Sequence, residues 1–118
     1  MQTREYRQKR PMNEKMTIEA LAGEAKRIMP RGSRVWLYGS RARGDARPDS
    51  DWDILLLVDK ADIDNTDFDK YSYPLIELGW KYGADLTPQM YTRADWEKMR
   101  ITPFYQNVEH DKRVIYES

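Results

Sequence analysis

The residues best suited to chemistry lie on either side of a short polar loop. Gly39-Ser40 follow directly after a short β-rich segment, and Asp51 and Asp53 open the most apolar run of the chain. Gly39 lets the backbone approach a ligand without a Cβ in the way. Ser40 presents a hydroxyl and a backbone N–H where a short helix can begin, which is a natural position for a phosphate. This half of the pattern therefore predicts an anion site.

The second half of the pattern is a pair of carboxylates. Asp51 and Asp53 are two residues apart at the start of a predicted strand, so both side chains point to one face. Two like charges at the edge of an apolar sheet repel each other unless a cation lies between them. Their oxygens suit Mg²⁺, which shares its coordination shell with substrate phosphates. With Arg41 and Arg43 adding positive charge nearby, the pattern predicts a metal-dependent reaction on a nucleoside triphosphate.

The composition excludes several other kinds of chemistry. The 118 residues contain no Cys, which removes disulfides, thiol catalysis and Cys-ligated metal sites. The single histidine, His110, excludes a His-rich metal site and stands between two acidic residues near a predicted helix end, which favours a surface position. A net charge of zero gives no overall attraction to nucleic acid or membrane, and sequence-specific nucleic-acid binding is not expected.

The length of the chain and the distribution of its apolar residues predict its size and its location. A chain of 118 residues is typical of one compact domain. No apolar run approaches the roughly 20 residues that a bilayer-spanning helix needs. The opening residues lack the apolar core of a secretory signal, which predicts a cytoplasmic protein without a membrane partner.

Hydrophobic periodicity predicts the elements that position the loop. We expect a helix capped by Thr17 and ended by Pro30, followed by a strand at 34–38 and a loop with at most a short helix at 39–52. The expected elements after this loop are a central strand at 53–58, a helix at 68–82, an extended segment at 84–90, helices at 92–99 and 102–108, and an edge strand at 114–116. This αβαβαβ order predicts one α+β domain at 16–118, a small mixed sheet packed by helices, after a polar extension at 1–15.

The loop resembles the signature of the polymerase-β-type nucleotidyltransferase superfamily, in which Gly-Ser is followed at a set distance by Asp-x-Asp. Gly-Ser-Arg-Ala-Arg-Gly at 39–44 and Ser-Asp-Trp-Asp at 50–53 are more specifically similar to the minimal nucleotidyltransferases of prokaryotes. Either half alone carries little information, whereas both together between two predicted strands are informative. The resemblance extends over 17–116, and it implies a nucleotidyltransferase fold.

The resemblance implies a role for each residue of the motif. Ser40 and the backbone around Gly39 would hold the β- and γ-phosphates of ATP or another nucleoside triphosphate. Asp51 and Asp53 would bind one or two Mg²⁺ ions that clamp the triphosphate. Arg43 would either neutralise charge on the phosphates or hold the loop through a nearby carboxylate, and the sequence leaves both roles open.

The resemblance also implies a third carboxylate on a neighbouring strand, for which Asp85 is the fitting candidate. The competing acidic residues lie in loops or at a helix start, namely Asp59, Asp62 and Asp95. Asp85 would complete a second metal site and help to deprotonate an acceptor hydroxyl that attacks the α-phosphorus and expels pyrophosphate. Two metal ions suit this step because they stabilise both the entering and the leaving oxygen.

Two functions follow from this resemblance. The first is Mg²⁺-dependent transfer of a nucleoside monophosphate, AMP from ATP as the main hypothesis, to a hydroxyl of a protein or small molecule. The second is an antitoxin-like module that binds a small helical partner of the HEPN class, with catalysis secondary or lost. The complete motif favours the enzyme. The sequence leaves open the acceptor, the base and whether the chain forms a homo-oligomer.

Overall fold

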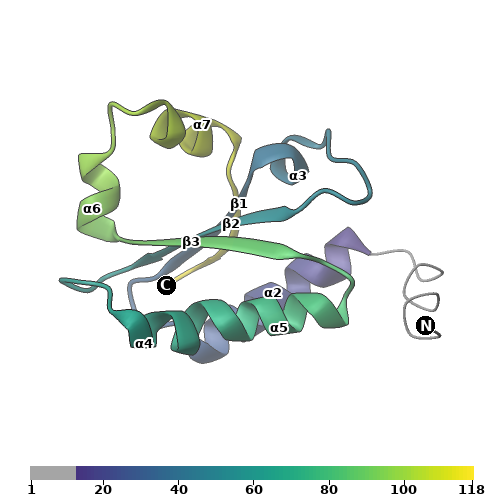
Figure 1. Cartoon of the computed structure of the whole chain (residues 1–118), viewed down its shortest axis with the longest axis horizontal. Helices are drawn as coiled ribbons and strands as arrows, with labels where there is room; N and C mark the ends of the chain where they lie inside the picture. The colour runs from purple at the N-terminus through teal and green to yellow at the C-terminus, as the bar shows by residue number, and fades with distance from the viewer. Residues whose placement is uncertain (1–12) are drawn as a thin grey trace.

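A four-stranded mixed sheet forms the centre of the computed structural model, which describes residues 13–118 (Figure 1). The strands are β1 (Arg34–Tyr38), β2 (Trp52–Val58), β3 (Leu86–Thr92) and β4 (Arg113–Glu117). Their order across the sheet is β3-β2-β1-β4, in which only the β2–β3 pair is parallel. The predicted α+β class with a small mixed sheet is therefore confirmed, and β4 lies at an edge as expected.

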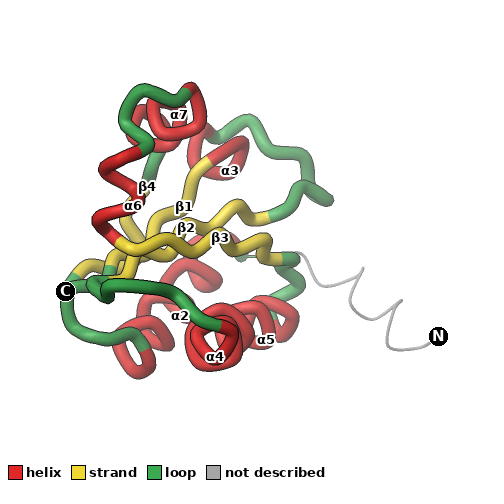
Figure 2. Tube along the Cα trace, turned by 60° about the vertical axis from the view of Figure 1, so that its left-hand side comes forward, coloured by secondary structure: helices red, strands yellow, loops and turns green. Residues whose placement is uncertain are grey.

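Helices cover both faces of this sheet. They are α2 (Glu14–Ile28), α3 (Gly39–Arg43), α4 (Asn65–Asp67), the π-helical turn η1 (Phe68–Ser72), α5 (Tyr73–Lys81), α6 (Arg93–Lys98) and α7 (Pro103–Asp111). Figure 2 shows α2, α4 and α5 on one face and α3, α6 and α7 on the other. None of the helices within 13–118 is long and apolar enough to cross a membrane.

Side chains that accept backbone hydrogen bonds fix the helix starts. The Thr92 and Thr102 hydroxyls accept from the N–H groups three residues later, at 3.0 Å and 3.2 Å, as their positions predict. The start of α2 differs from the prediction, because Asn13 rather than Thr17 is the cap and accepts from the Met16 N–H at 2.9 Å. Thr17 is buried one turn into the helix, where its hydroxyl donates to the Asn13 carbonyl. Residues 1–12 of the expected extension at 1–15 lie outside the described part of the chain.

The segment after β2 becomes helical earlier than predicted. Helical structure begins at Asn65, and η1 carries it into α5, whereas the periodicity of the sequence indicated a start at Phe68. Pro74 lies in the first turn of α5 and lacks the N–H that would bond to the carbonyl four residues before it. The Tyr73 N–H instead bonds to the Phe68 carbonyl, which is the five-residue spacing of a π-helical turn.

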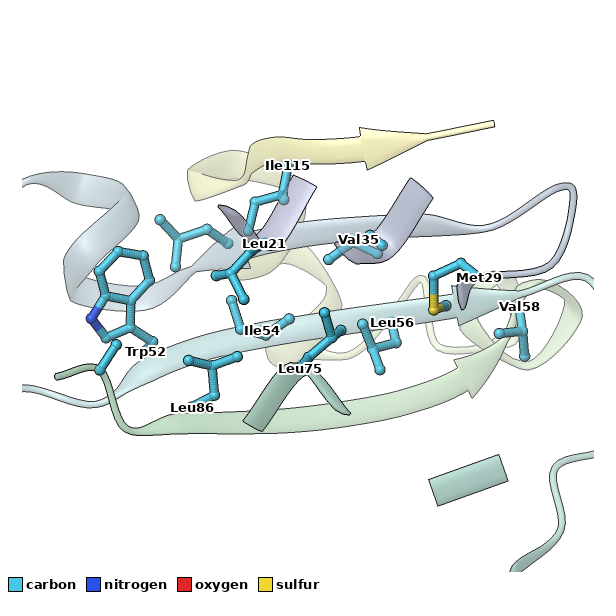
Figure 3. Packing of buried hydrophobic residues seen from close by; sticks show 13 residues of the cluster. Leu21, Met29, Val35, Trp52, Ile54, Leu56, Val58, Leu75, Leu86 and Ile115 are labelled. Atoms are coloured by element: carbon cyan, nitrogen blue, oxygen red, sulfur yellow. The ribbon is translucent and has the colours of Figure 1, made fainter. Parts of the chain in front are cut away.

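The core divides into two layers. Aliphatic residues of α2, α5 and the sheet fill the first layer together with Trp52 (Figure 3). These aliphatic residues include Leu21, Leu75, Val35, Ile54 and Leu86. The second lies beneath α6 and α7 and is built on Trp36 and Trp96, whose ring centroids are 6.4 Å apart. This second layer covers Leu55 and Leu57 but leaves Asp53 only half-buried. The Asp53 end of the sheet is therefore open on the face that carries α3.

Candidate active site

The two halves of the motif meet at the end of the β1–β2 ladder. Tyr38 at the end of β1 pairs with Asp53 at the start of β2, so that Gly39 comes next to Asp53. The Gly39 φ of +74° lies in the left-handed region, where a side chain is unfavourable. A Cβ at this position would also collide with the Asp53 carboxylate. Gly39 is therefore required both by its backbone conformation and by the close approach of Asp53.

Ser40 lies at the start of α3, and its carbonyl is hydrogen-bonded within the described part of the chain whereas its hydroxyl is not. Its carbonyl accepts hydrogen bonds from the N–H groups of Gly44 and Asp45, at 2.9 Å and 3.1 Å. Its hydroxyl makes no hydrogen bond with any other group of residues 13–118. The Ser40 hydroxyl, half-buried beside Gly39, is thus available to a ligand.

Asp53, in β2, and Asp51, directly before β2, flank Trp52 on its two sides in the chain and lie on the side that the aliphatic core does not use. The residue between them, Trp52, is fully buried in that core, and side chains alternate along a strand. Partial burial raises the pKa of Asp53, the negative charge of Asp51 raises it further, and the positive charge of Arg43 lowers it in part. The predicted repulsion between the two carboxylates is therefore present in the folded chain.

This carboxylate pair fits a hard divalent cation. Within residues 13–118, neither Asp51 nor Asp53 forms a side-chain ion pair or hydrogen bond. An oxygen-only donor pair with unrelieved negative charge is the kind of site that Mg²⁺ occupies when substrate phosphates and waters complete its shell. The described part of the chain holds no group of three or more acidic or histidine side chains arranged for a metal ion. Within that part of the chain, Asp85 is therefore not brought into one cluster with Asp51 and Asp53, and the three-carboxylate metal site stays a prediction.

Asp85 lies at the same end of the sheet as the pair. Its carbonyl accepts a hydrogen bond from the Trp52 N–H at 2.8 Å, and the parallel register places Leu86 beside Trp52. Asp59 lies beyond the opposite end of β2, about 20 Å away along a seven-residue strand. Asp95 similarly follows the far end of β3, in α6. Asp85 stays the best candidate for a third carboxylate, a role that remains a prediction.

Arg41 supports the loop between the two halves of the motif. Its buried guanidinium donates to the carbonyls of Pro48 and Ser50 at 3.1 Å and 2.9 Å, and it lies 5.1 Å above the Trp52 ring. These contacts fix the backbone that leads to Asp51. The sequence indicated only that Arg41 adds positive charge, because its burial depends on how the loop folds back over it.

Arg43 is bound on two sides. Its Nε donates to Asp45 at 3.3 Å, the local link that the sequence allowed, and its Nη1 donates to Asp111 at 3.0 Å. Asp111 ends α7 and is 68 residues away in the chain, so no local pattern indicated this contact. The other oxygen of Asp111 contacts the exposed His110 ring at 2.9 Å. The expected surface position of His110 is confirmed.

Tyr38 is a site residue that the sequence reasoning did not single out. Burial, followed by the negative charge of Asp53, raises the pKa of Tyr38 to about 12. Its ring packs edge-on against Phe104 of α7, with centroids 5.6 Å apart. The phenol is therefore neutral at physiological pH and stands beside the carboxylate pair. Its place in the strand directly before Gly39 was the one available signal.

Comparison with known proteins decides the family. Residues 18–116 match the family model described as the nucleotidyltransferase domain, which spans most of the chain. The chain belongs to this nucleotidyltransferase family. The sequence resemblance is thus confirmed at the level of the family, and with it the general activity, the transfer of a nucleotidyl group.

Relatives of this nucleotidyltransferase agree with the assignment. A protein of Methanocaldococcus jannaschii, whose name proposes a protein adenylyltransferase, is 31% identical over 106 residues, covering 89% of this chain and 100% of that protein. The structure of a tri-AMPylated Shewanella oneidensis HEPN toxin in complex with its MNT antitoxin aligns with a TM-score of 0.57 at 17% identity, covering 90% of this chain and 74% of that one. A toxin–antitoxin structure with AMP-PNP aligns with a TM-score of 0.56 at 20% identity, covering 90% and 75%.

The two structural likenesses establish the fold of the nucleotidyltransferase. Within this fold, Gly39, Ser40, Asp51 and Asp53 lie at one end of the sheet. In this nucleotidyltransferase the Gly-Ser turn, which the sequence predicts to bind an anion, is a direct neighbour of the carboxylate pair. A phosphate bound at the first would lie within reach of a cation bound at the second.

Proposed function

We propose that this nucleotidyltransferase moves AMP from ATP to a hydroxyl of a protein or small molecule, with Mg²⁺ bound and with release of pyrophosphate. The observation that carries the proposal is the contact between Gly39 and Asp53, which places an unrelieved carboxylate pair directly beside the Gly-Ser turn. The choice of an adenylyl group is supported by the name of the M. jannaschii relative and by the AMP-PNP in one structural neighbour.

The residues of the site divide the work of binding. The Ser40 hydroxyl and the N–H groups at the start of α3 donate to the β- and γ-phosphates, while Asp51 and Asp53 hold the cation. Mg²⁺, when bound, neutralises charge on the triphosphate and polarises the α-phosphoryl group. Arg43 supplies further positive charge from the end of α3.

The chemical step balances as a substitution at phosphorus. The acceptor hydroxyl oxygen forms a bond to the α-phosphorus, the bond from that phosphorus to the β-bridging oxygen breaks, and pyrophosphate leaves. We assign the acceptor proton to the Asp85 carboxylate, which lies at the same end of the sheet as Asp51. Asp85 thus acts as general base, in addition to its expected role in binding a second cation.

A second function is favoured by the structural neighbours, which include toxin–antitoxin structures. In this alternative the chain is an antitoxin-like module that binds a helical HEPN-type partner, and transfer is secondary or lost. A cytoplasmic location and a single domain at 16–118 belong to both proposals. A homo-oligomer is compatible with either.

Incubation with ATP labelled at the α-phosphate, Mg²⁺ and a HEPN-type protein encoded beside the gene separates the two functions. Label on the partner, absent with Asp51→Asn, supports the transferase. A stable complex without label, from a chain that also fails to release pyrophosphate from ATP in the presence of other hydroxyl acceptors, supports the binding module. Wild-type chain that neither labels nor binds the partner, and that does not turn over ATP, contradicts both.

A further inference from the structure

Arg43 has two nitrogens of its guanidinium bound and the third left open. Nε donates to Asp45 and Nη1 donates to Asp111, whereas Nη2 makes no hydrogen bond with any group of residues 13–118. A guanidinium is planar and carries five N–H donors in a rigid arrangement. Holding two of its nitrogens therefore also fixes the direction in which the Nη2 donors point.

Asp111 is the stronger of the two anchors. Its side chain is 12% exposed, and its two oxygens are divided between Arg43 and His110. The helix that carries it is firmly packed, because Val108 is buried in the aromatic layer and the Lys112 N–H closes the last turn on the Val108 carbonyl. Asp45, in contrast, is 64% exposed and lies in the loop that follows α3.

The guanidinium held in this way belongs to the short helix that begins at the Gly-Ser turn. α3 runs from Gly39 to Arg43, and Gly39 lies against the Asp53 carboxylate. α3 has only five residues, so its own packing gives a long side chain at its last position little support. Without an anchor, Arg43 would lose rotamer freedom each time it bound an anion, and the bound state would be weaker.

We propose that Asp111 is a positioning residue for nucleotide binding. It holds Arg43 so that Nη2 donates to a phosphate oxygen of the triphosphate that approaches Gly39 and Ser40. The inference rests on the proposed function, and it adds to the motif a residue of α7 that lies outside both Gly-Ser and Asp-x-Asp. The aromatic layer under α7 thereby takes part in binding by fixing the position of Asp111.

A double-mutant cycle tests whether Asp111 acts through Arg43. The ligand is the α,β-methylene analogue of ATP with Mg²⁺, which cannot be cleaved at the transferred bond, and the readout is its dissociation constant by calorimetry. Asp111→Asn and Arg43→Ala are each expected to weaken binding roughly three- to tenfold, as for residues in one hydrogen-bonded network. The double variant should bind no more weakly than Arg43→Ala alone. Additive losses, or an unchanged constant in a folded Asp111→Asn protein, overturn the proposal.

Further variants separate positioning from a general effect on the fold. Asp45→Asn, at the exposed partner, should weaken binding less than Asp111→Asn, while Asp111→Glu should restore part of the loss. If Asp111→Asn does not fold, Arg43→Lys replaces it, because Lys keeps the charge but has no fixed planar edge. Unchanged affinity in Arg43→Lys overturns the inference. Wild-type protein that does not bind the analogue removes the proposed function as well, whereas normal wild-type binding with an unaffected Asp111→Asn removes only the role of Asp111.

Discussion

Asp53 lies at the start of β2 and Asp67 at the end of α4, the first helix after β2, and their surroundings shift their pKa values in opposite directions. Asp67 is fully buried, accepts hydrogen bonds from the Lys60 ammonium at 2.7 Å and the Asp64 N–H at 2.9 Å, and has a pKa lowered chiefly by Lys60. Asp53 is half-buried without such partners, and burial followed by Asp51 raises its pKa. The fold pairs the Asp67 carboxylate with a lysine and leaves the Asp53 carboxylate without a partner among residues 13–118.

This difference separates residues that serve the fold from residues that serve a ligand. A lowered carboxyl pKa means that the ionised form of Asp67 stabilises the folded chain, while a raised one means that ionised Asp53 destabilises it. Asp67 closes the capping box of α4 together with Asp64. Asp53 has no comparable structural task, so its charge is explained by what it binds.

The largest expected effect is on transfer after substitution in the carboxylate pair. Asp51→Asn or Asp53→Asn removes one charge from the proposed cation site, and we expect nucleotidyl transfer to fall by at least about 10²-fold, the range for loss of one preorganised electrostatic group. Because Asp53 is unfavourable when ionised, Asp53→Asn should be as stable to urea as wild type, or more stable.

Asp67→Asn is the matched control for this first prediction, since it changes the carboxylate at the end of α4 to the same amide. It should retain transfer near the wild-type rate at a temperature where it is folded. A fully active Asp53→Asn enzyme, measured by release of pyrophosphate, contradicts the assignment of the site.

Gly39→Ala is expected to affect both the fold and the activity. The positive φ of Gly39 costs an alanine about 1–2 kcal/mol, and the new Cβ pushes the Asp53 carboxylate away from the Gly-Ser turn. Urea unfolding should show the loss of stability, and pyrophosphate release should fall together with it. Both effects arise at the same contact that the proposed function depends on.

Gly23→Ala provides the comparison for Gly39, because nothing lies within 4 Å of a Cβ at this position in α2. It should be neutral or stabilising by up to about 1 kcal/mol, as expected for glycine replaced by alanine within a helix. An equally harmless Gly39→Ala would show that the turn tolerates a side chain beside Asp53.

Asp67→Asn should reduce stability while leaving the chemistry intact. It replaces a charged acceptor of the Lys60 ammonium by a neutral amide, and the free energy of unfolding should fall by about 1–3 kcal/mol. Lys60→Met removes the other member of the pair and should shift the urea midpoint in the same direction. Transfer that is lost while the protein remains folded would break the distinction drawn between Asp67 and Asp53.

Much of this site could be predicted from the sequence because its main contact is local in the sheet. The strand at 34–38 and the apolar run at 53–58 are readable from composition, and an antiparallel pair joined by one loop brings Gly39 next to Asp53. The two predicted strands and the single loop between them therefore account for the neighbouring positions of the Gly-Ser turn and the carboxylates, although the sequence did not indicate how the strands pair.

The contacts that were missed join parts of the chain that no local pattern relates. Asp111 reaches Arg43 across 68 residues, and the burial of Arg41 depends on loop carbonyls folding over its side chain. The cap of α2 was misplaced for a similar reason, since Thr17 is polar by type and buried in the structure. Polar residues read from a sequence are expected at caps and surfaces, and packing overrides this expectation where a hydrogen bond satisfies them.

The smallest expected effect is the pH dependence of stability, measured by urea unfolding in the presence of a chelator. For Asp53 the folded pKa lies above the unfolded one, so the penalty of its charge is complete at neutral pH. This penalty disappears as pH falls through the raised pKa towards the ordinary aspartate value. For Asp67 the folded pKa lies below the unfolded one, so its contribution is complete above the ordinary value and is lost only as pH falls below it.

The two variants should therefore converge on wild type in different pH ranges. As pH falls, the difference in free energy of unfolding between Asp53→Asn and wild type should disappear above the ordinary aspartate pKa. The deficit of Asp67→Asn should disappear only below that pKa. Thr66→Ala removes a hydrogen-bond partner of Asp64 and none of Asp53 or Asp67, so it should leave both pH ranges unchanged. If both differences closed over one range, the two carboxylates would share a single environment, and Asp53 would have no unrelieved charge to offer a cation.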